Sequence, residues 1–434
     1  MTYQRAITYL FELQKFGIKL GLDNITRLLQ LLGNPQQNLR CIHIAGTNGK
    51  GSTAAFLQSI CSRNGLRAGL YTSPHLIDFT ERIKINSHTI TRKKVIALTK
   101  MIRRICSENN LRHITFFEFV TAMALCYFDE QNADPVIIET GLGGTYDATN
   151  IVTPLLSIIT SIGLDHQQYL GNTQTKILID KAGIIKNRTD VLSGIMQPGL
   201  KITLRQISSS RHSSLHEIGK QIRFRRRRPS VFNYYGLNGN IKDIQCGITG
   251  DKQFRNASLA LASSELLRRK GYDFNMNAAK DAIAQTRLPG RLECVSRNPA
   301  IVLDGAHNVP AWRALQSDLK KYFSYKKLYF IIGIMADKDI NQLIQILLPS
   351  AGQVVFCRPD MTRSADRKHL EKFVSFSSKN KVLWQDTTLQ AIQHITAKMK
   401  ISDLLCITGS FFTVGEAREY FLKNSQLTSG RIGL

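Results

Sequence analysis

The sequence predicts an α/β fold, and three observations support this. A short apolar run, residues 41–45, stops at a glycine-rich turn and is followed by apolar residues at helical spacing. Two further apolar runs, residues 136–139 and 155–162, indicate buried strands that end in polar residues. After residue 300, five such runs alternate with amphipathic segments, as in a largely parallel sheet with helices on both faces. At 434 residues the chain is long enough for two or three domains.

The turn after the first strand predicts a phosphate-binding loop. A strand, a glycine-rich turn and a helix in succession aim free backbone N–H groups and the positive end of a helix dipole at phosphate oxygens. Lys50 adds a point charge suited to the β- and γ-phosphates of ATP, and Ser52 or Thr53 offers a hydroxyl to Mg²⁺. Ile44 stands where the common pattern has glycine, and Gly51 where it has Ser or Thr. A plain strand-to-helix turn is the alternative.

Composition bounds the classes of function. Lysine and arginine outnumber aspartate and glutamate by 58 to 32, and the net charge of +26 favours anionic partners such as ATP, carboxylates or nucleic acid. No apolar run reaches about 18 residues, so we expect no membrane span. The N-terminus lacks a signal-peptide core, and the eight cysteines include no C-x-x-C pair. This pattern favours free thiols in a reducing cytoplasm.

The segments on either side of the phosphate loop predict further helices and strands. Two amphipathic helices fill the first part of the chain and end at Gly33. Residues 68–73 predict a strand, and the alternation over residues 80–85 predicts another. A helix over residues 95–107 and a very apolar helix from Thr115 to Asp129 follow.

The strand ends carry the candidate chemistry. Glu139 ends its strand and is followed at once by the glycine-rich run 141–144. Open α/β sheets place ligands beyond the carboxyl ends of parallel strands, so Glu139 is a natural Mg²⁺ ligand; a carboxylate without a role is the alternative. His166 follows the next strand, where it is either a ligand or a satisfied polar residue. By itself, Lys181 indicates only a helix surface.

The middle of the chain shows less order. Residues 187–250 have no clear organisation, and their main feature is the basic tract Arg223–Pro229 with its one aromatic residue. Such a tract can bind nucleic acid, but a stretch this short more often forms a solvated edge or loop, so we expect no nucleic-acid partner. A helix over residues 254–271 precedes the expected domain boundary. The strands predicted beyond it cover residues 300–303, 328–332, 354–357, 382–383 and 404–408.

A series of ordered motifs resembles one protein family. The motifs are Gly46–Ser52, Ser73–Leu76, Glu139–Asn150, Leu164–His166, Lys181–Ile184, Asn256–Ala257, Pro289–Glu293 and Asp304–Asn308. In order and spacing they resemble the folylpolyglutamate synthase and dihydrofolate synthase family, relatives of the Mur ligases, and in particular its bifunctional bacterial type. The resemblance implies a P-loop, Mur-ligase-like ATPase domain over residues 1–293 and a smaller Rossmann-like α/β ligase domain over residues 294–434. It also implies an active site in the cleft between these domains.

The resemblance implies a set of site residues. It places ATP on Gly46, Thr47, Asn48, Gly49, Lys50, Gly51, Ser52, Thr53, Asn256, Arg291 and Asp304. It gives Mg²⁺ the ligands Ser73, Glu139 and His166. It assigns catalytic roles to Lys50, Lys181 and His307, with Lys181 carbamylated so that a cation becomes an anion. It places the acceptor substrate on Gly17, Ile18, Lys19, Leu20, Thr115, Tyr146, Asp147 and Ala148.

The reaction that the resemblance implies is ATP-dependent amide formation. The substrate carboxylate attacks the γ-phosphate to give an acyl phosphate, and the amine of L-glutamate then displaces phosphate. The acceptor is dihydropteroate, which gives dihydrofolate, or the γ-carboxylate of a reduced folate, which gives polyglutamates. The implied cofactors are one or two Mg²⁺ ions and a monovalent cation. We expect a cytoplasmic monomer with these small-molecule partners and no membrane partner.

Two other functions stay open on the sequence alone. A Mur-type ligase acting on another carboxylate would be expected to carry a further N-terminal domain, and only about 40 residues precede the phosphate loop. A nucleic-acid-binding ATPase that uses the arginine tract would hydrolyse ATP without an amino acid. The chain also departs from the family pattern, with Thr145 in place of arginine, Asp180 in place of glutamate and Lys252 in place of histidine. The first change removes a bidentate anion contact.

Overall fold

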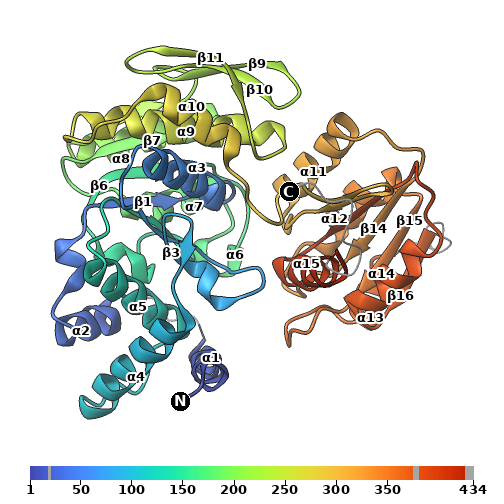
Figure 1. The fold of residues 1–434 in the computed structure, drawn as a ribbon, viewed down its shortest axis with the longest axis horizontal. Coiled ribbons are helices and arrows are strands. Elements are labelled where there is room, and N and C mark those ends of the chain that lie inside the picture. The colour runs from blue at the N-terminus through green and yellow to red at the C-terminus, as the bar shows by residue number, and fades with distance from the viewer. Residues whose placement is uncertain (18–20, 375–380, 426–434) are drawn as a thin grey trace. The chain divides into compact units, whose positions relative to one another are not determined.

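The computed structural model describes residues 1–17, 21–374 and 381–425, and the chain folds as two compact units (Figure 1). Unit 1 comprises Met1–Gly247 and Gln253–Thr286, and unit 2 comprises Ile248–Lys252 and the chain from Arg287 onward. The domain division expected after residue 293 stays a prediction. Three of the expected substrate residues, Ile18, Lys19 and Leu20, lie outside the described residues.

Unit 1 is organised around an eight-stranded sheet with the order β4-β3-β2-β5-β1-β6-β7-β8. Its strands are β1 (Cys41–Ala45), β2 (Gly69–Tyr71), β3 (Ile83–Ile85), β4 (His88–Thr89), β5 (Val136–Glu139), β6 (Pro154–Ile159), β7 (Asp190–Ser193) and β8 (Ser214–Glu217). All pairs from β2 to β8 are parallel, and β3 and β4 add an antiparallel edge. Every residue of β1 is buried, which explains why this central strand is a short apolar run.

The helices of unit 1 cover its sheet and supply two apolar cores. They are α1 (Tyr3–Glu12), α2 (Asp23–Leu31), α3 (Lys50–Arg63), α4 (Arg92–Glu108), α5 (Phe116–Glu130), α6 (Gln167–Leu170), α7 (Gln174–Lys181), α8 (Pro198–Ser210), α9 (Asp251–Arg268) and α10 (Met276–Gln285). Short 3₁₀ turns are η1 (Leu13–Phe16), η2 (Pro35–Asn38), η3 (Phe79–Arg82), η4 (Ala148–Ile151) and η5 (Ala182–Ile184). The strand predicted over residues 80–85 is therefore wrong in its first half. An Asp78–Glu81 capping box turns that half into η3 before β3 begins.

A second, three-stranded sheet lies in the segment predicted to be poorly organised. Its strands are β9 (Arg223–Arg228), β10 (Val231–Tyr235) and β11 (Asn240–Gln245), all antiparallel, in the order β11-β10-β9. It packs on α9, where the Phe232 and Phe254 rings lie 5.2 Å apart and the Tyr234 hydroxyl donates to Glu265 Oε2 at 2.9 Å. The prediction missed these strands because arginines replace the alternating apolar residues in β9. The basic tract is nevertheless a solvated edge, as expected.

Unit 2 is a six-stranded sheet with the order β12-β13-β17-β14-β15-β16. Its strands are β12 (Glu293–Arg297), β13 (Ala300–Leu303), β14 (Leu328–Ile332), β15 (Gln353–Cys357), β16 (Val382–Gln385) and β17 (Leu404–Thr408). Its helices are α11 (Val309–Tyr322), α12 (Ile340–Leu347), η6 (Leu348–Ser350), α13 (Arg367–Glu371), α14 (Thr388–Thr396) and α15 (Phe411–Ser425). The five predicted strands are confirmed, and only the antiparallel edge strand β12 was not foreseen.

Two composition-based expectations can be compared with this fold. All eight cysteines are free thiols, as expected. Within residues 1–17, 21–374 and 381–425, no helix has both the length and the apolar character needed to cross a bilayer.

Candidate active site

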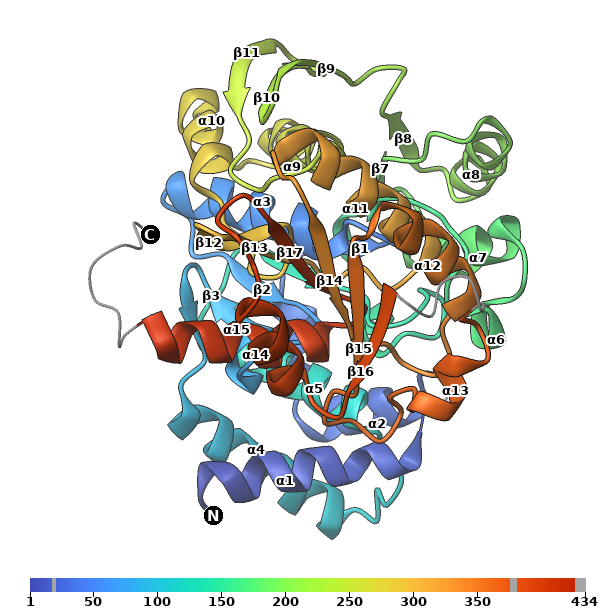
Figure 2. The same cartoon turned by 90° about the vertical axis from the view of Figure 1, so that its right-hand side faces the viewer.

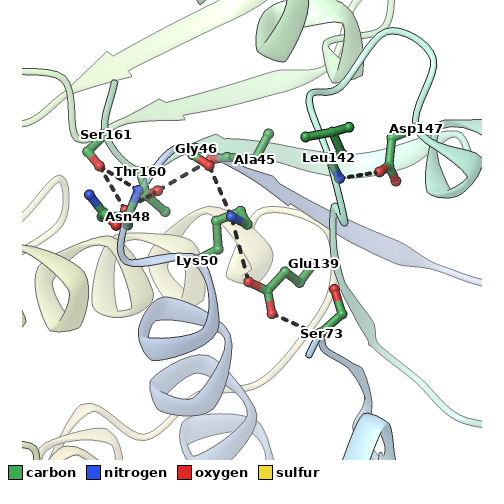
Figure 3. Close-up of polar contacts among 10 residues, drawn as sticks. All are labelled: Ala45, Gly46, Asn48, Lys50, Ser73, Glu139, Leu142, Asp147, Thr160 and Ser161. Atoms are coloured by element: carbon green, nitrogen blue, oxygen red, sulfur yellow. Dashed lines mark hydrogen bonds and ion pairs between the residues drawn. The ribbon is translucent and has the colours of Figure 1, made fainter. Parts of the chain in front are cut away.

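The phosphate loop leaves β1 at Gly46 and enters α3 at Lys50. Gly46 has φ +151°, and a Cβ there would lie 2.0 Å from Thr160 Oγ1, so only glycine fits. The residues after β6 hold the loop from behind (Figure 3). Thr160 Oγ1 and Ser161 Oγ each donate to the Asn48 carbonyl at 2.8 Å, and Asn48 N donates back to Ser161 Oγ at 3.1 Å. Because these contacts come from outside the loop, the loop keeps its shape without a ligand.

The start of α3 matches the needs of an anion. Gly49 has φ +91° and provides no side-chain cap for the first turn of the helix. The orphan N–H groups and positive end of such a helix attract phosphate. Thr47 faces away from this end, because its hydroxyl donates to the Gly163 carbonyl at 3.1 Å and accepts from Gly163 N at 3.0 Å.

Lys50, Glu139 and Ser73 meet beside this loop, from three separate segments of unit 1. Lys50 Nζ donates to the Gly46 carbonyl at 3.1 Å and lies 3.9 Å from Glu139 Oε1, while Ser73 N donates to Glu139 Oε2 at 3.2 Å (Figure 3). Glu139 is only 5% exposed, and a Cβ on Gly51 would lie 3.5 Å from its Oε2. A partly buried lysine suited to phosphate and a buried carboxylate suited to a metal therefore lie side by side where α3 begins and β5 ends.

Asn256 brings α9 to the same loop. A Cβ on Gly49 would lie 2.6 Å from Asn256 Oδ1, so the amide packs directly on the loop backbone. Asn256 Nδ2 donates to Gln253 Oε1 at 2.9 Å, whereas Oδ1 is buried without a hydrogen-bond partner among the described residues. A buried acceptor of this kind suits a donor group on a ligand.

Lys181 is buried at the end of α7, at 4% exposure, so the interpretation of a helix-surface lysine is wrong. The pKa of its ammonium is lowered to about 7, chiefly by burial and then by the charge of Lys50, while Asp180, Asp165 and Asp147 oppose the shift. A substantial fraction of the side chain is therefore a neutral amine near pH 7. Such an amine is nucleophilic, whereas an exposed lysine is almost fully protonated at this pH.

The loop after β5 is held by its own acid, Asp147. Asp147 Oδ2 accepts from Leu142 N at 2.7 Å, and Oδ1 accepts from Thr149 N at 3.0 Å and from the Thr149 hydroxyl. His43 Nε2 lies 2.8 Å from Thr149 Oγ1. Because the single hydroxyl proton of Thr149 goes to Asp147, His43 is the donor and carries its proton on Nε2. Burial lowers the pKa of His43 to about 3, which keeps the ring neutral.

Sequence reasoning did not find His43 or Thr149. The available signal was a lone histidine inside an otherwise apolar strand, which usually means a satisfied core residue. At Thr145, where the family pattern has arginine, both the backbone N–H and the hydroxyl donate to the Asp180 carbonyl, at 3.0 and 2.9 Å. This threonine fastens the loop to α7 next to Lys181.

The expected substrate residues differ in their surroundings. Tyr146 is 52% exposed, and Ala148 is buried at the start of η4. Thr115 caps α5, because its hydroxyl accepts from Glu118 N at 3.2 Å while Thr115 N donates to Glu118 Oε2 at 2.8 Å. The Thr115 hydroxyl and the Asp147 carboxylate thus already serve their own segments. Gly17, with φ +66°, ends η1.

The expected metal ligands do not form a complete cage. His166 has a left-handed backbone before α6, and its Nε2 lies 3.9 Å from Asp165 Oδ1. In the part of the chain that the structure describes, no group of three or more His, Cys, Asp or Glu residues is arranged to hold a metal. Mg²⁺ usually combines one or two carboxylates with phosphate oxygens and water, so Glu139 beside the phosphate loop still fits it.

Unit 2 gathers its own polar cluster at the end of β13. Asp304 is buried, and its carboxylate accepts from Leu292 N and Ala306 N, each at 2.9 Å. Burial raises its pKa, which the Arg291 charge opposes. His307 Nδ1 lies 2.8 Å from the Gly305 carbonyl, and its ring packs 5.7 Å from Phe411. The Arg291 guanidinium lies 4.6 Å from the centre of the Phe411 ring. The nucleotide contacts expected of this cluster stay a prediction.

Comparison with known proteins identifies the chain's relatives. Residues 44–264 match the Mur ligase middle domain, and residues 290–411 match the glutamate ligase domain of Mur ligases. The dihydrofolate synthase/folylpolyglutamate synthase of Bacillus subtilis is 32% identical over 96% of this chain and 98% of its own length. The Escherichia coli enzyme of the same name is 31% identical over 95% and 94%.

The chain belongs to the dihydrofolate synthase/folylpolyglutamate synthase family. Solved structures agree with this assignment. Mycobacterium tuberculosis folylpolyglutamate synthase complexed with ADP and AMPPCP has a TM-score of 0.88 and 30% identity, over 99% of this chain and 100% of that chain. Escherichia coli FolC in complex with DHPP and ADP has a TM-score of 0.86 and 28% identity, over 97% and 98%. The predicted family, the Mur-ligase α/β fold and the ligase class are confirmed.

Proposed function

We propose that this family member is an ATP-dependent ligase that adds L-glutamate to dihydropteroate and to the γ-carboxylate of reduced folates. The observation that carries the proposal is the meeting of Lys50, Glu139 and Ser73 at the phosphate loop. A carboxylate and an amine do not form an amide in water without activation. The substrate carboxylate therefore takes the γ-phosphoryl group to become an acyl phosphate, and the amine of glutamate displaces phosphate.

The phosphate loop and α3 bind the triphosphate in this proposal. The loop, residues 46–53, supplies backbone N–H groups, and Lys50 reaches the β- and γ-phosphates once it leaves the Gly46 carbonyl. Asn256 Oδ1 supplies the buried acceptor beside Gly49. The complexes of relatives with ADP and AMPPCP support this placement. Arg291, Asp304 and His307 are the further residues that we assign to the nucleotide.

Mg²⁺ fits the oxygen donors beside the loop. Glu139 is a buried carboxylate next to Ser73, and we assign these two residues and His166 as ligands. When bound, one or two Mg²⁺ ions would spread the charge of the transferring phosphoryl group. A monovalent cation as a further cofactor stays a prediction.

We assign Lys181 as a carbamylated lysine. Its lowered pKa supports this, because only the neutral amine adds to CO₂, and the proton released goes to solvent. The product is an anion in place of a cation, and it would lie among Lys50 and the acidic residues that surround Lys181. The negative charge of the carbamate would then attract the Lys50 ammonium and help to hold Lys50 in place.

We place the acceptor along the loop between β5 and η4. Tyr146 is its most exposed side chain, and Asp147, Thr149 and His43 keep its backbone in one shape. The complex of a relative with DHPP supports a pterin-bearing acceptor. We also propose that the protein is a cytoplasmic monomer, with which its eight free thiols are consistent.

Phosphate release in a purified system tests the function. The assay contains ATP, Mg²⁺, L-glutamate and either dihydropteroate or tetrahydrofolate, and each component is omitted in turn. Release that needs glutamate and occurs with both acceptors supports the proposal, and mass spectrometry should find one or more added glutamyl units. Release that ignores glutamate but rises with nucleic acid would favour an ATPase instead. No glutamate-dependent release with either acceptor would favour a Mur-type ligase for another carboxylate.

A further inference from the structure

An edge strand of unit 1 concentrates arginine outside the ligase site. β9 carries arginine at positions 223, 225, 226, 227 and 228, and all five side chains are exposed. Among the described residues, Arg223, Arg225, Arg227 and Arg228 form no salt bridge with an acid. We call β9, with these four side chains, the arginine strand. One or two charges are enough to protect a sheet edge from unwanted pairing, so edge protection alone does not explain five arginines in one strand.

The arginine strand is separated from the phosphate loop by a layer of helices. α10 packs on α3 on one side and on β11 on the other. Figures 1 and 2 both show the sheet of β9, β10 and β11 lying over α9 and α10. A partner on the arginine strand would therefore leave the start of α3 accessible to ATP.

The geometry of the strand suits a repeating phosphate partner. Side chains on one face of a strand recur at about 6.7 Å, so neighbouring guanidinium groups can reach successive phosphates of an extended polymer. Each planar guanidinium can bind a phosphate through two parallel hydrogen bonds. Tyr235 pairs with Arg223, so the two side chains share one face of the sheet, and the partly exposed Tyr235 ring offers a face for stacking a base.

Two other classes of partner fit less well. A peptide adding a further strand needs a regular edge, but the register passes from Phe232↔Arg226 to Val231↔Arg228, which leaves Arg227 in a bulge. A bulge bends the edge and disrupts pairing. A membrane surface is usually gripped by large apolar side chains as well as cations, and none is highly exposed over residues 214–247.

We propose that the arginine strand binds single-stranded nucleic acid through its phosphate backbone. This binding is independent of base sequence and of the ligase reaction. It goes beyond the proposed function, and the two can fail separately. The structure changes the expectation of no nucleic-acid partner, because the tract is an ordered edge strand on which all five arginines are exposed.

The test is fluorescence anisotropy of the full chain with a labelled 20-nucleotide poly(U), measured without ATP and with saturating ATP. Four phosphate contacts predict a salt slope of about −2.8, hence about 50-fold weaker binding at 200 mM than at 50 mM KCl. The triple variant Arg223→Gln/Arg225→Gln/Arg227→Gln leaves one of the four contacts. Its salt slope should therefore be shallower, at about −0.7, and its binding at 50 mM KCl should be weaker by at least about tenfold. The matched control removes the same charge from α4, as Lys93→Gln/Lys100→Gln/Arg104→Gln, and should keep the wild-type slope.

Several outcomes would overturn the proposal. They are no binding at 50 mM KCl, equal loss in the two triple variants, displacement by ATP, or equally good binding of a poly-glutamate peptide or of phosphatidylserine vesicles. Both triple variants should keep the melting temperature and ligase kcat/KM of the wild type within about twofold, because neither set touches the ligase site. RNA binding by a chain without ligase activity would refute the proposed function alone.

Discussion

Two glycine-rich loops follow the neighbouring parallel strands β1 and β5, and they are stabilised in different ways. The phosphate loop is held from outside by Thr160 and Ser161, and the helix that follows it has no side-chain cap. The loop after β5 is held from within by Asp147, which occupies the N–H group of Leu142. The start of α3 therefore keeps its first-turn N–H groups for a ligand, whereas the second loop uses its own acid to hold its backbone in one shape.

This comparison predicts that changes in the first loop affect the use of ATP and changes in the second affect the acceptor. The largest effect should come from Lys50→Ala. It removes the point charge that the proposal places on the β- and γ-phosphates, and kcat should fall about 10³-fold. Steady-state kinetics and a melting curve check this, and the melting temperature should stay near the wild-type value. Unchanged activity would remove the phosphate loop from the mechanism.

A comparable loss should follow Lys181→Ala, which removes the carbamate proposed at the back of the second loop. We expect about 10³-fold lower kcat and partial rescue by formate or acetate, which restore an anion in the space left by the side chain. Propylamine, a cation of similar size, is the control and should not rescue. An active enzyme whose Lys181 is unmodified by intact mass and by electron density would refute the carbamate.

Gly46→Ala tests whether the contact between the phosphate loop and Thr160 is needed for ATP binding. The new Cβ would collide with Thr160 Oγ1, and φ +151° is strained for alanine, so the KM for ATP should rise about 10²-fold. Adding Thr160→Ala removes the collision but not the strain, and it should restore part of the loss. If the KM for the pterin acceptor rises instead, the assignment of this loop to ATP is wrong.

The second loop predicts a smaller and different effect. Thr149→Val keeps the shape of the side chain but breaks the link between His43 and Asp147. The KM for dihydropteroate should rise about tenfold with the KM for ATP unchanged, and unfolding should cost about 1–2 kcal/mol less. Thr149→Ser keeps the hydroxyl and should behave like the wild type. Equal effects of both variants would show that the hydroxyl link does not matter.

The smallest effect is a pH dependence of stability caused by Lys181. Its folded-state pKa of about 7 lies below the usual value for lysine, so between these two values the unfolded chain binds more protons. In CO₂-free buffer, stability should therefore rise with pH above about 7, and below that pH the cost of burying the cation is complete. Lys181→Met should stabilise more at pH 6 than at pH 9 in urea unfolding. A gain that is the same at both pH values would contradict the shift.

Much of the site could be predicted because it depends on local spacing. The strand, turn and helix around residues 41–63 specify the phosphate loop, and an apolar run that ends in Glu139 indicates a strand end facing a ligand. The sheet of β9, β10 and β11 could not be predicted, because five arginines conceal the alternation of an edge strand that has only one face to bury. The 3₁₀ turn η3 was predicted as a strand, because its residues alternate in polarity while the Asp78–Glu81 capping box stabilises a turn.

By itself, the sequence determined the family, the α/β class, the order of the motifs and the residue types at each strand end. The tertiary structure alone decided which of these side chains are buried and what they touch. Lys181 is the clearest case, because its helix gives no sign that the amine is enclosed; its low pKa arises from neighbours that are distant along the chain. His43 is the second, because its link to Asp147 exists only once β1 and η4 pack together. The physical reason is that desolvation and hydrogen-bond geometry depend on all the segments packed around a group, which local spacing does not contain.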